Sequence, residues 1–195
     1  MKFKTFLAGC LGGLLSLNSC TNSPDMTDYA AYVNPFIGTG GHGHTFPGAI
    51  VPHGMISPSP DTRIDGWDAC SGYYYADSTI NGFSHTHLSG TGCCDYGDVL
   101  LMPTVGEQKY LPTGSQSQQM AYASAFSHQN ETAEPGYYSV FLDTYQVKAE
   151  LTASKRAAIH RYTFPESKEA GFILDLDYSL QRQTNKDGNR GHQPH

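Results

Sequence analysis

Apolar and polar positions alternate along several short segments in the second half of the chain. The clearest example is residues 145–153 (YQVKAELTA), in which Tyr145 and every second residue after it are apolar while the residues between them are polar. A period of two is typical of an antiparallel strand that buries one face. Four further segments are short and rich in β-branched and aromatic residues, and we predict a strand in each: residues 98–105, 137–143, 157–164 and 172–177.

The first half of the chain has a different pattern. Glycine, proline and histidine dominate residues 34–72 and exclude a regular helix, while the interspersed apolar residues favour ordered loops over disorder. We interpret residues 115–128 as a loop, or at most a short helix around residues 120–126. Turn sequences such as EPGYY and FPESKEAG separate the strands at the short spacing of a sandwich. The sequence therefore predicts an all-β, antiparallel β-sandwich with a loop-rich first half.

The chain ends with the polar, aperiodic sequence NRGHQPH, shortly after a predicted buried strand. A sandwich normally completes its sheets, so we expect an incomplete domain, with unpaired strand edges that favour aggregation. The length of the chain otherwise predicts one domain.

The N-terminus has the pattern of an export signal. Lys2 and Lys4 precede an apolar run over residues 6–17, which is too short for a permanent transmembrane helix. Leu-Asn-Ser followed by Cys20 is similar to a bacterial lipobox, and a plain secretory signal with a chance cysteine is the alternative. We expect residues 1–19 to be a lipoprotein signal peptide, residues 20–28 an acylated Cys20 and tether, and residues 29–195 a partial sandwich domain.

Charge and cysteine content narrow the choice of partners. Without residues 1–19 the chain keeps 10 basic against 18 acidic residues, a net charge of −8. This acidity argues against a nucleic-acid partner and against purely electrostatic membrane binding. An exported protein can form disulfides, and Cys70 could pair with Cys93 or Cys94, but three free thiols are an equal alternative.

Two His-x-His pairs, His42 with His44 and His85 with His87, are candidate metal ligands. Together with a carboxylate or thiolate they could form a four-coordinate zinc site. However, the sequence contains no Cys-x-x-Cys or His-Glu-x-x-His spacing, and glycines beside the first pair leave its direction open. We therefore expect no metal site in this chain.

A cysteine nucleophile is a second alternative. Cys93 or Cys94 could act as a thiolate, with His85 or His87 as its base. Adjacent cysteines in an exported protein are more often structural, so the sequence disfavours this hypothesis.

A carbohydrate site explains more of these residues. Sugars bind through an aromatic face against the apolar side of the pyranose ring, with rigid polar groups on the hydroxyls and glycines that allow close approach. Trp67, the single tryptophan, lies in IDGWDACSGYYY, and histidines occur in the loop SHTHLSG. The alternative is that the tryptophan is a core residue and that the histidines brace loops.

Several segments of the chain together resemble the amino-terminal part of glycoside hydrolase family 92. They are YVNPFIGTGGHGHTFPGA, VPHGM, SPSPDTR, INGFSHTHLSGTGCCDYGD, AEPGYYSV, VKAELTASKRAAIHRYTFP and ILDLD, in order from about residue 32 to residue 185. The family consists of exo-acting, calcium-dependent α-mannosidases, many of them lipoproteins or secreted enzymes of gut Bacteroidetes. The resemblance implies a supersandwich-like β-domain followed by a catalytic (α/α)6 barrel, with the active site between the two.

The resemblance also implies how the two domains divide the chemistry. Inverting hydrolysis needs one carboxylic acid on the leaving oxygen and one carboxylate that activates water. In the family these groups and the Ca²⁺ ligands come from the barrel, so we expect no catalytic residue and no calcium ligand in this chain. Asp65, Asp68, Asp95 and Asp98 are then expected to cap turns and to pair with Arg63.

On this comparison the chain lines the substrate cleft, and Trp67 contacts the mannose at the cleaved position. The loops that contain the other expected substrate-binding residues face the same cleft; these residues are His42, His44, His85, His87 and Asp95. The predicted function is thus the cleft-contributing part of an exported, calcium-dependent α-1,2-mannosidase-like enzyme, inactive alone. Its expected partners are an α-mannoside glycan and the missing barrel domain, in cis or in trans.

The expected location is the periplasm or the outer-membrane surface, with the membrane reached only through the lipid anchor. A free-standing carbohydrate-binding lipoprotein is the alternative function.

Overall fold

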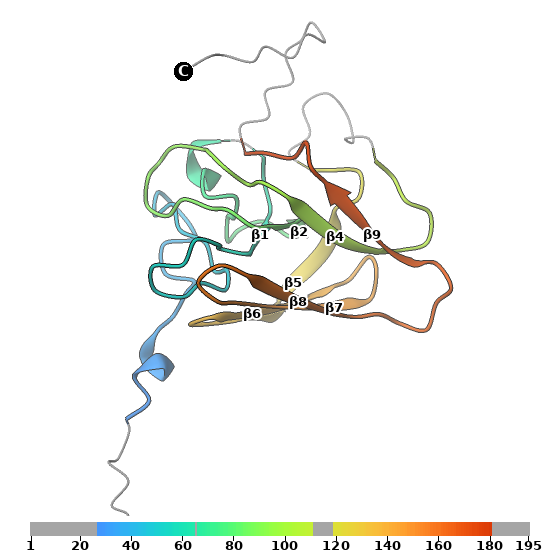
Figure 1. The fold of residues 1–195 in the computed structure, drawn as a ribbon. Coiled ribbons are helices and arrows are strands. Elements are labelled where there is room, and N and C mark those ends of the chain that lie inside the picture. The colour runs from blue at the N-terminus through green and yellow to red at the C-terminus, as the bar shows by residue number, and fades with distance from the viewer. Residues whose placement is uncertain (1–26, 65, 111–118, 181–195) are drawn as a thin grey trace, which may run out of the picture.

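The computed structural model describes residues 27–64, 66–110 and 119–180. In these ranges the chain forms two antiparallel sheets that lie one above the other (Figure 1). The prediction of an all-β chain is therefore confirmed. The predicted signal peptide, Cys20, most of the tether, Asp65 and the final tail fall outside the described residues.

The first sheet has four strands in the order β1-β3-β4-β9 and the second has five in the order β2-β5-β6-β7-β8. The strands of the first sheet are β1 (Ser59–Asp61), β3 (Gly82–Ser84), β4 (Leu100–Val105) and β9 (Ala170–Asp175). Those of the second sheet are β2 (Thr79–Ile80), β5 (Ser124–Glu134), β6 (Tyr137–Leu142), β7 (Val147–Ala153) and β8 (Ala158–Thr163). Strands β5 to β8 follow one another in sequence and in space, which makes the second sheet mainly a meander.

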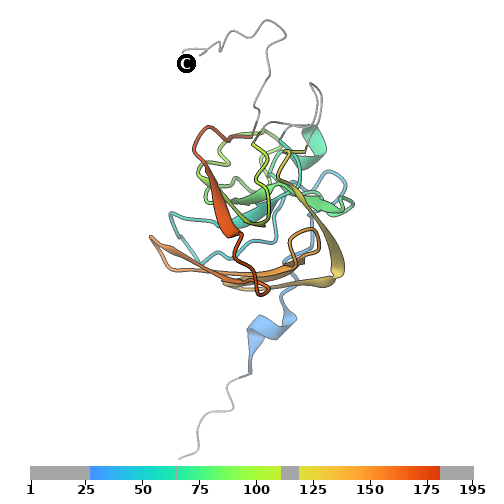
Figure 2. The same ribbon diagram turned by 90° about the vertical axis from the view of Figure 1, so that its right-hand side faces the viewer.

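The core lies between the two sheets. Both contribute fully or almost fully buried apolar side chains, among them Leu100, Met102, Ile173, Val140, Leu142, Val147, Ala149 and Leu151. The blue and teal loops of the first half lie mainly to the left of the two sheets in Figure 1, and Figure 2 shows the two sheets from the side as an upper and a lower layer. The two sheets thus form a scaffold that positions the glycine-rich loops.

The interpretation of residues 115–128 as a loop or short helix is wrong from residue 124 onward, where β5 begins. The strand is the longest in the described ranges, yet its sequence SAFSHQNETAE is polar and breaks the apolar alternation. Neighbouring strands determine its conformation, since β2 pairs with one edge and β6 with the other. A register shift between Phe126 and Glu131 accounts for the broken alternation, because a bulge turns the following side chains to new directions.

The predicted alternation of residues 145–153 is confirmed in β7, where Val147, Ala149 and Leu151 are buried. Glu150 is also buried, which the alternation did not predict. Hydrogen bonds donated by Arg161 and by the hydroxyl of Tyr137 lower the pKa of Glu150 to about 2, so the carboxylate is ionised and paired.

A buried carboxylate joins the loop layer to the second sheet. The hydroxyls of Tyr73, in the loop region, and Tyr138, in β6, donate to Glu131 Oε1 at 3.0 and 2.6 Å. His128 Nδ1 lies 2.6 Å from Glu131 Oε2. Burial and the adjacent Glu131 raise the pKa of both tyrosines, so both hydroxyls keep their protons and can donate.

Two short 3₁₀ helices complete the described chain, η1 (Tyr29–Tyr32) and η2 (Trp67–Ala69). Across the described ranges, no helical segment combines the length and the apolar character that crossing a bilayer requires. The three cysteines in these ranges are free thiols, which decides between the two alternatives for Cys70, Cys93 and Cys94.

Candidate functional site

A tight loop presents the first predicted His-x-His pair. Gly38 adopts φ +83°, and a Cβ on Gly43 would lie 2.2 Å from the carbonyl oxygen of Gly38, so the loop closes only with glycine at both positions. Thr45 fastens the end of the loop, since its hydroxyl donates to the carbonyl of Ile37 at 2.9 Å. The loop thus holds His44 inward and carries His42 at its exposed tip.

Helix η2 presents the tryptophan beside this loop. Trp67 is 60% exposed, which excludes the core alternative for it. The rings of Trp67 and His44 pack edge to face, with their centroids 4.6 Å apart and an interplanar angle of 84°. Gly92 lies against both rings, because a Cβ at that position would lie 2.7 Å from Trp67 Cη2 and 3.1 Å from His44 Cε1.

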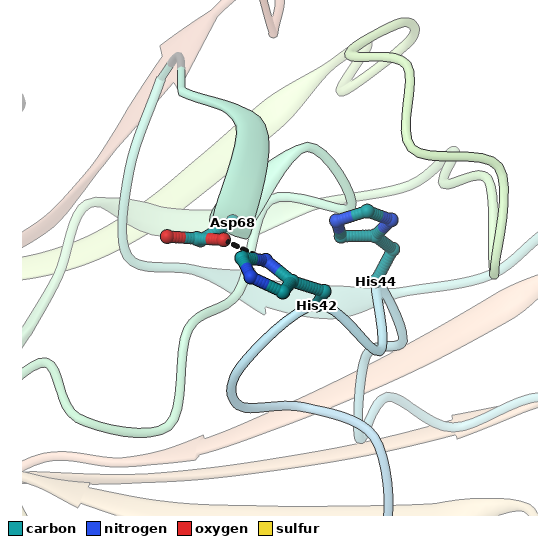
Figure 3. A group of neighbouring side chains, drawn as sticks. All are labelled: His42, His44 and Asp68. Atoms are coloured by element: carbon teal, nitrogen blue, oxygen red, sulfur yellow. Dashed lines mark hydrogen bonds and ion pairs between the residues drawn. The ribbon is translucent and has the colours of Figure 1, made fainter.

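Asp68, next to the tryptophan, completes the group. Its Oδ1 lies 2.6 Å from His42 Nδ1, and the side chains of His42 and Asp68 are 75% and 39% exposed. Figure 3 shows His42, His44 and Asp68 turned toward one another. We call Trp67, His42, His44 and Asp68 the tryptophan cluster; it combines an exposed aromatic face with imidazole and carboxylate groups.

The second predicted His-x-His pair does not join this cluster. The side chain of His87 is completely buried, with Nε2 2.7 Å from Asp61 Oδ1 and 3.0 Å from the hydroxyl of Ser84. His85 Nδ1 lies 2.5 Å from the carbonyl oxygen of Val99, and its ring stacks on His160. The side chains of both histidines therefore make contacts within the fold.

The loop that carries these histidines lines a separate hollow of about 440 Å³. Thr86, Ser89 and Tyr96 contribute from this loop, opposite the segment around Met55. Residues 83–98 therefore contact the tryptophan cluster through Gly92 and line this hollow through Thr86, Ser89 and Tyr96.

The aspartates are arranged differently from the sequence prediction. Arg63 forms a two-pronged pair with Asp77, at 2.7 to 3.1 Å, and this pair raises the pKa of the guanidinium. Asp68 contacts His42 instead of Arg63. Asp95 is exposed and accepts only a local hydrogen bond from its neighbour's backbone, while Asp98 accepts from the hydroxyl of Thr86.

The alternative of a cysteine nucleophile gains no support from the thiols. Cys94 Sγ donates to the carbonyl of Gly66 at 3.5 Å, and His85 and His87 are occupied by the contacts described above.

Among the described residues, one group of three metal-ligating side chains converges: His42, His44 and Asp68, with ligand atoms within 4.8 Å of one another. Calcium takes six to eight oxygen ligands. Two imidazoles and one carboxylate do not fit that requirement, so this group is not a calcium site. Sequence reasoning did not find Asp68, because it is 26 residues from His42 and no local motif connects the two.

The model of the glycosyl hydrolase family 92 N-terminal domain matches residues 32–192. An uncharacterized secreted glycosidase of Arthroderma benhamiae is 32% identical over 141 residues, which cover 72% of this chain and 18% of that protein.

Solved structures agree with the sequence match. The family GH92 α-mannosidase BT3965 of Bacteroides thetaiotaomicron, in complex with mannoimidazole, is 47% identical with a TM-score of 0.73, over 77% of this chain and 20% of that one. The family GH92 inverting mannosidase BT2199 of the same organism is 35% identical with a TM-score of 0.62, over 75% and 19% of the two chains. The chain thus spans about a fifth of the length of the relatives it matches.

Proposed function

Because this chain belongs to glycosyl hydrolase family 92 through its N-terminal domain, we propose that it forms one wall of the substrate cleft of an exported α-mannosidase. The observation that carries this proposal is the exposed ring of Trp67, which packs against His44 and Gly92. A tryptophan that is 60% exposed contributes little to the core. Its ring is held in place by its neighbours and provides an apolar face for one side of a mannose ring.

The polar members of the tryptophan cluster suit the sugar's hydroxyl groups. His42 and Asp68 are exposed and hydrogen-bonded to each other, so each has capacity for a hydroxyl beside the indole. Side chains that are already ordered lose less conformational entropy on binding. In this proposal the cluster binds and orients the sugar without transferring a proton to the glycosidic oxygen.

Proton transfer is assigned to a partner domain. Inversion needs two carboxyl groups about 6.5–9.5 Å apart on opposite sides of the bond that breaks. We propose that both groups, and the oxygen ligands of the calcium ion that the family implies, belong to an (α/α)6 barrel packed against the loops, in cis or in trans. The chain alone is then inactive, and a secreted relative supports its export.

Export as a lipoprotein anchored at Cys20, in the periplasm or on the outer-membrane surface, is part of the same proposal. Labelling cells with a radioactive fatty acid tests it, since the wild-type chain is expected to incorporate label and Cys20→Ala is not.

The test of the main proposal is an assay of mannose release from α-1,2-mannobiose. The purified chain is assayed alone and with a co-expressed family 92 barrel domain, each with and without calcium. We expect release only when the barrel and calcium are both present. Release by the chain alone would show that it carries its own acid and base, and no release from any combination would refute a shared cleft.

A further inference from the structure

The side chains of His42, His44 and Asp68 form a cluster that the family resemblance does not use as a metal site. His42 and His44 come from one loop and Asp68 from helix η2, and their three ligand atoms lie within 4.8 Å of one another. Figure 3 shows the imidazole of His44 with one nitrogen turned toward the other two side chains. The cluster is therefore convergent, with donors from two separate segments of the chain.

A second observation concerns His44. This residue is only 7% exposed, and its Nε2 is buried with no hydrogen-bond partner. A buried polar atom without a partner is costly, and such atoms in folded proteins usually have a bound ion, a water or a functional role. Because the unpartnered nitrogen points into the cluster, a ligand placed there would satisfy it.

The backbone and ring contacts of His44 fix the direction of its side chain, which restricts where that ligand can be. Its backbone adopts φ +55°, its carbonyl accepts a 2.6 Å hydrogen bond from the amide of Gly90, and the indole of Trp67 packs against its ring. The side chain of His42, in contrast, is 75% exposed, so it can change rotamer toward a ligand. One donor is fixed and another is adaptable.

We propose that His42, His44 and Asp68 bind a divalent transition-metal ion, most simply Zn²⁺, with a fourth position open to solvent beside Trp67. Imidazole nitrogens and one carboxylate are ligands that zinc accepts in tetrahedral sites. Zn–N and Zn–O distances of about 2.0–2.2 Å place tetrahedral ligands roughly 3.3–3.5 Å apart. Forming the site therefore requires the 2.6 Å contact between His42 and Asp68 to lengthen and the other separations to shorten, which movement of His42 allows.

The ligand set also distinguishes this site from the family's calcium. Magnesium and calcium prefer oxygen ligands, of which the cluster offers only the carboxylate of Asp68. The metal site does not depend on the proposed mannosidase function, because binding of the ion requires neither a sugar nor a barrel. The exposed side of the cluster leaves room for water at the fourth position.

The experiment is a calorimetric titration of the purified, chelator-treated chain with Zn²⁺ and, separately, with Ca²⁺. We expect one zinc ion per chain and no calcium binding. Substitution by Co²⁺ is expected to give the strong visible absorption of a four-coordinate site. Absence of zinc binding, or equal binding of both ions, would overturn the proposal.

Variants identify the ligands. We expect His42→Ala and Asp68→Asn each to weaken zinc binding at least tenfold, since even the partners behind metal ligands contribute ~10–100-fold. Both side chains are exposed, so these variants are expected to fold normally. Zinc affinity unchanged in both would refute the assignment.

The chain offers a matched control for His44. His53 also adopts a positive φ, +57° against +55°, but it is exposed and outside the cluster. Asparagine tolerates this backbone conformation, so the two variants His44→Asn and His53→Asn share the backbone cost and differ in the burial of the replaced ring and in whether a proposed ligand is lost. We expect only His44→Asn to abolish zinc binding, and melting curves without metal check that both variants are folded. Equal effects of the two substitutions would count against the site.

Discussion

His87 Nε2 lies 2.7 Å from Asp61 Oδ1, and neither side chain has any exposed surface. His87 Nδ1 lies 2.7 Å from the carbonyl oxygen of Ser57, so both ring nitrogens face oxygen acceptors. The contact between His87 and Asp61 fastens the loop after β3 to strand β1, and with it the segment that supports the tryptophan cluster.

Replacing Asp61 by Asn is expected to destabilise the fold by about 1–3 kcal/mol, because it weakens the buried hydrogen bond to His87 and leaves a buried polar group without a matched partner. Chemical denaturation measures this change. The control is Asp28→Asn, at an exposed cap where asparagine serves as well, with an expected change of less than about 0.5 kcal/mol. Equal effects would mean that the buried pair contributes nothing specific.

Two glycines of one loop provide a test of the support for Trp67. Gly90 and Gly92 adopt φ +73° and +65°, but a Cβ meets nothing within 4 Å at Gly90 and lies 2.7 Å from the indole at Gly92. Alanine at either position has a similar backbone cost of about 1–2 kcal/mol. We expect only Gly92→Ala to shift the fluorescence of this single tryptophan, since it alone displaces the ring. Identical spectra for the two variants would contradict the packing described.

Replacing Trp67 by Ala is expected to weaken binding of methyl α-mannoside about tenfold, equivalent to ~1.4 kcal/mol. Chemical-shift titration of the labelled chain measures this, since one wall of a cleft is expected to bind weakly. Tyr110→Ala is the control, because that ring is exposed to 62% against 60% for Trp67 but is not in the cluster. Equal loss in both variants would indicate non-specific adhesion of the sugar.

His160 is expected to make the fold sensitive to mild acid. Burial, together with the neighbouring His85, lowers the pKa of His160 to about 4, against an ordinary value of 6.5. Between pH 6.5 and 4 the unfolded chain binds more protons at His160 than the folded chain does. The contribution of neutral, buried His160 to the free energy of unfolding is therefore intact above pH 6.5 and is lost as the pH falls toward 4. The slope is at most about 1.4 kcal/mol per pH unit for one proton.

The variant His160→Phe keeps a ring that can stack on His85 but cannot be protonated. It is expected to flatten the dependence of unfolding free energy on pH between 6.5 and 4. The loss of the hydrogen bond with Tyr162 shifts stability at all pH values in this range and leaves the slope unaffected. An unchanged slope would mean that other groups cause the acid sensitivity.

Sequence reasoning identified β7 from its alternation, and β4 and β6 from their β-branched and aromatic residues, although these two strands bury consecutive residues. In β7 the exception at Glu150 arises from Arg161 on the next strand, which local pattern cannot reveal. Strand β5 was missed because its polar residues are held in place by two neighbouring strands and a bulge.

The candidate site was predicted only in part, because it too depends on contacts between residues far apart in the sequence. Side chains at i and i+2 point the same way only within a regular strand. Strand β3 ends at Ser84, so the spacing of His85 and His87 carries no such meaning, and the two rings face different partners. His42 and His44 converge with Asp68 because a glycine loop and a distant 3₁₀ helix meet, which depends on the tertiary fold.

The cross-link at Glu131 has a kinetic consequence. Strands β5 to β8 join neighbours in sequence and can form early, whereas the hydrogen bond from Tyr73 to Glu131 closes a separation of 58 residues. We expect the loop layer to order last during refolding and to open first in native-state hydrogen exchange. The surface proposed to bind sugar would then form only in fully folded molecules. Ligand binding during refolding would therefore report the fully folded fraction and would not detect folding intermediates.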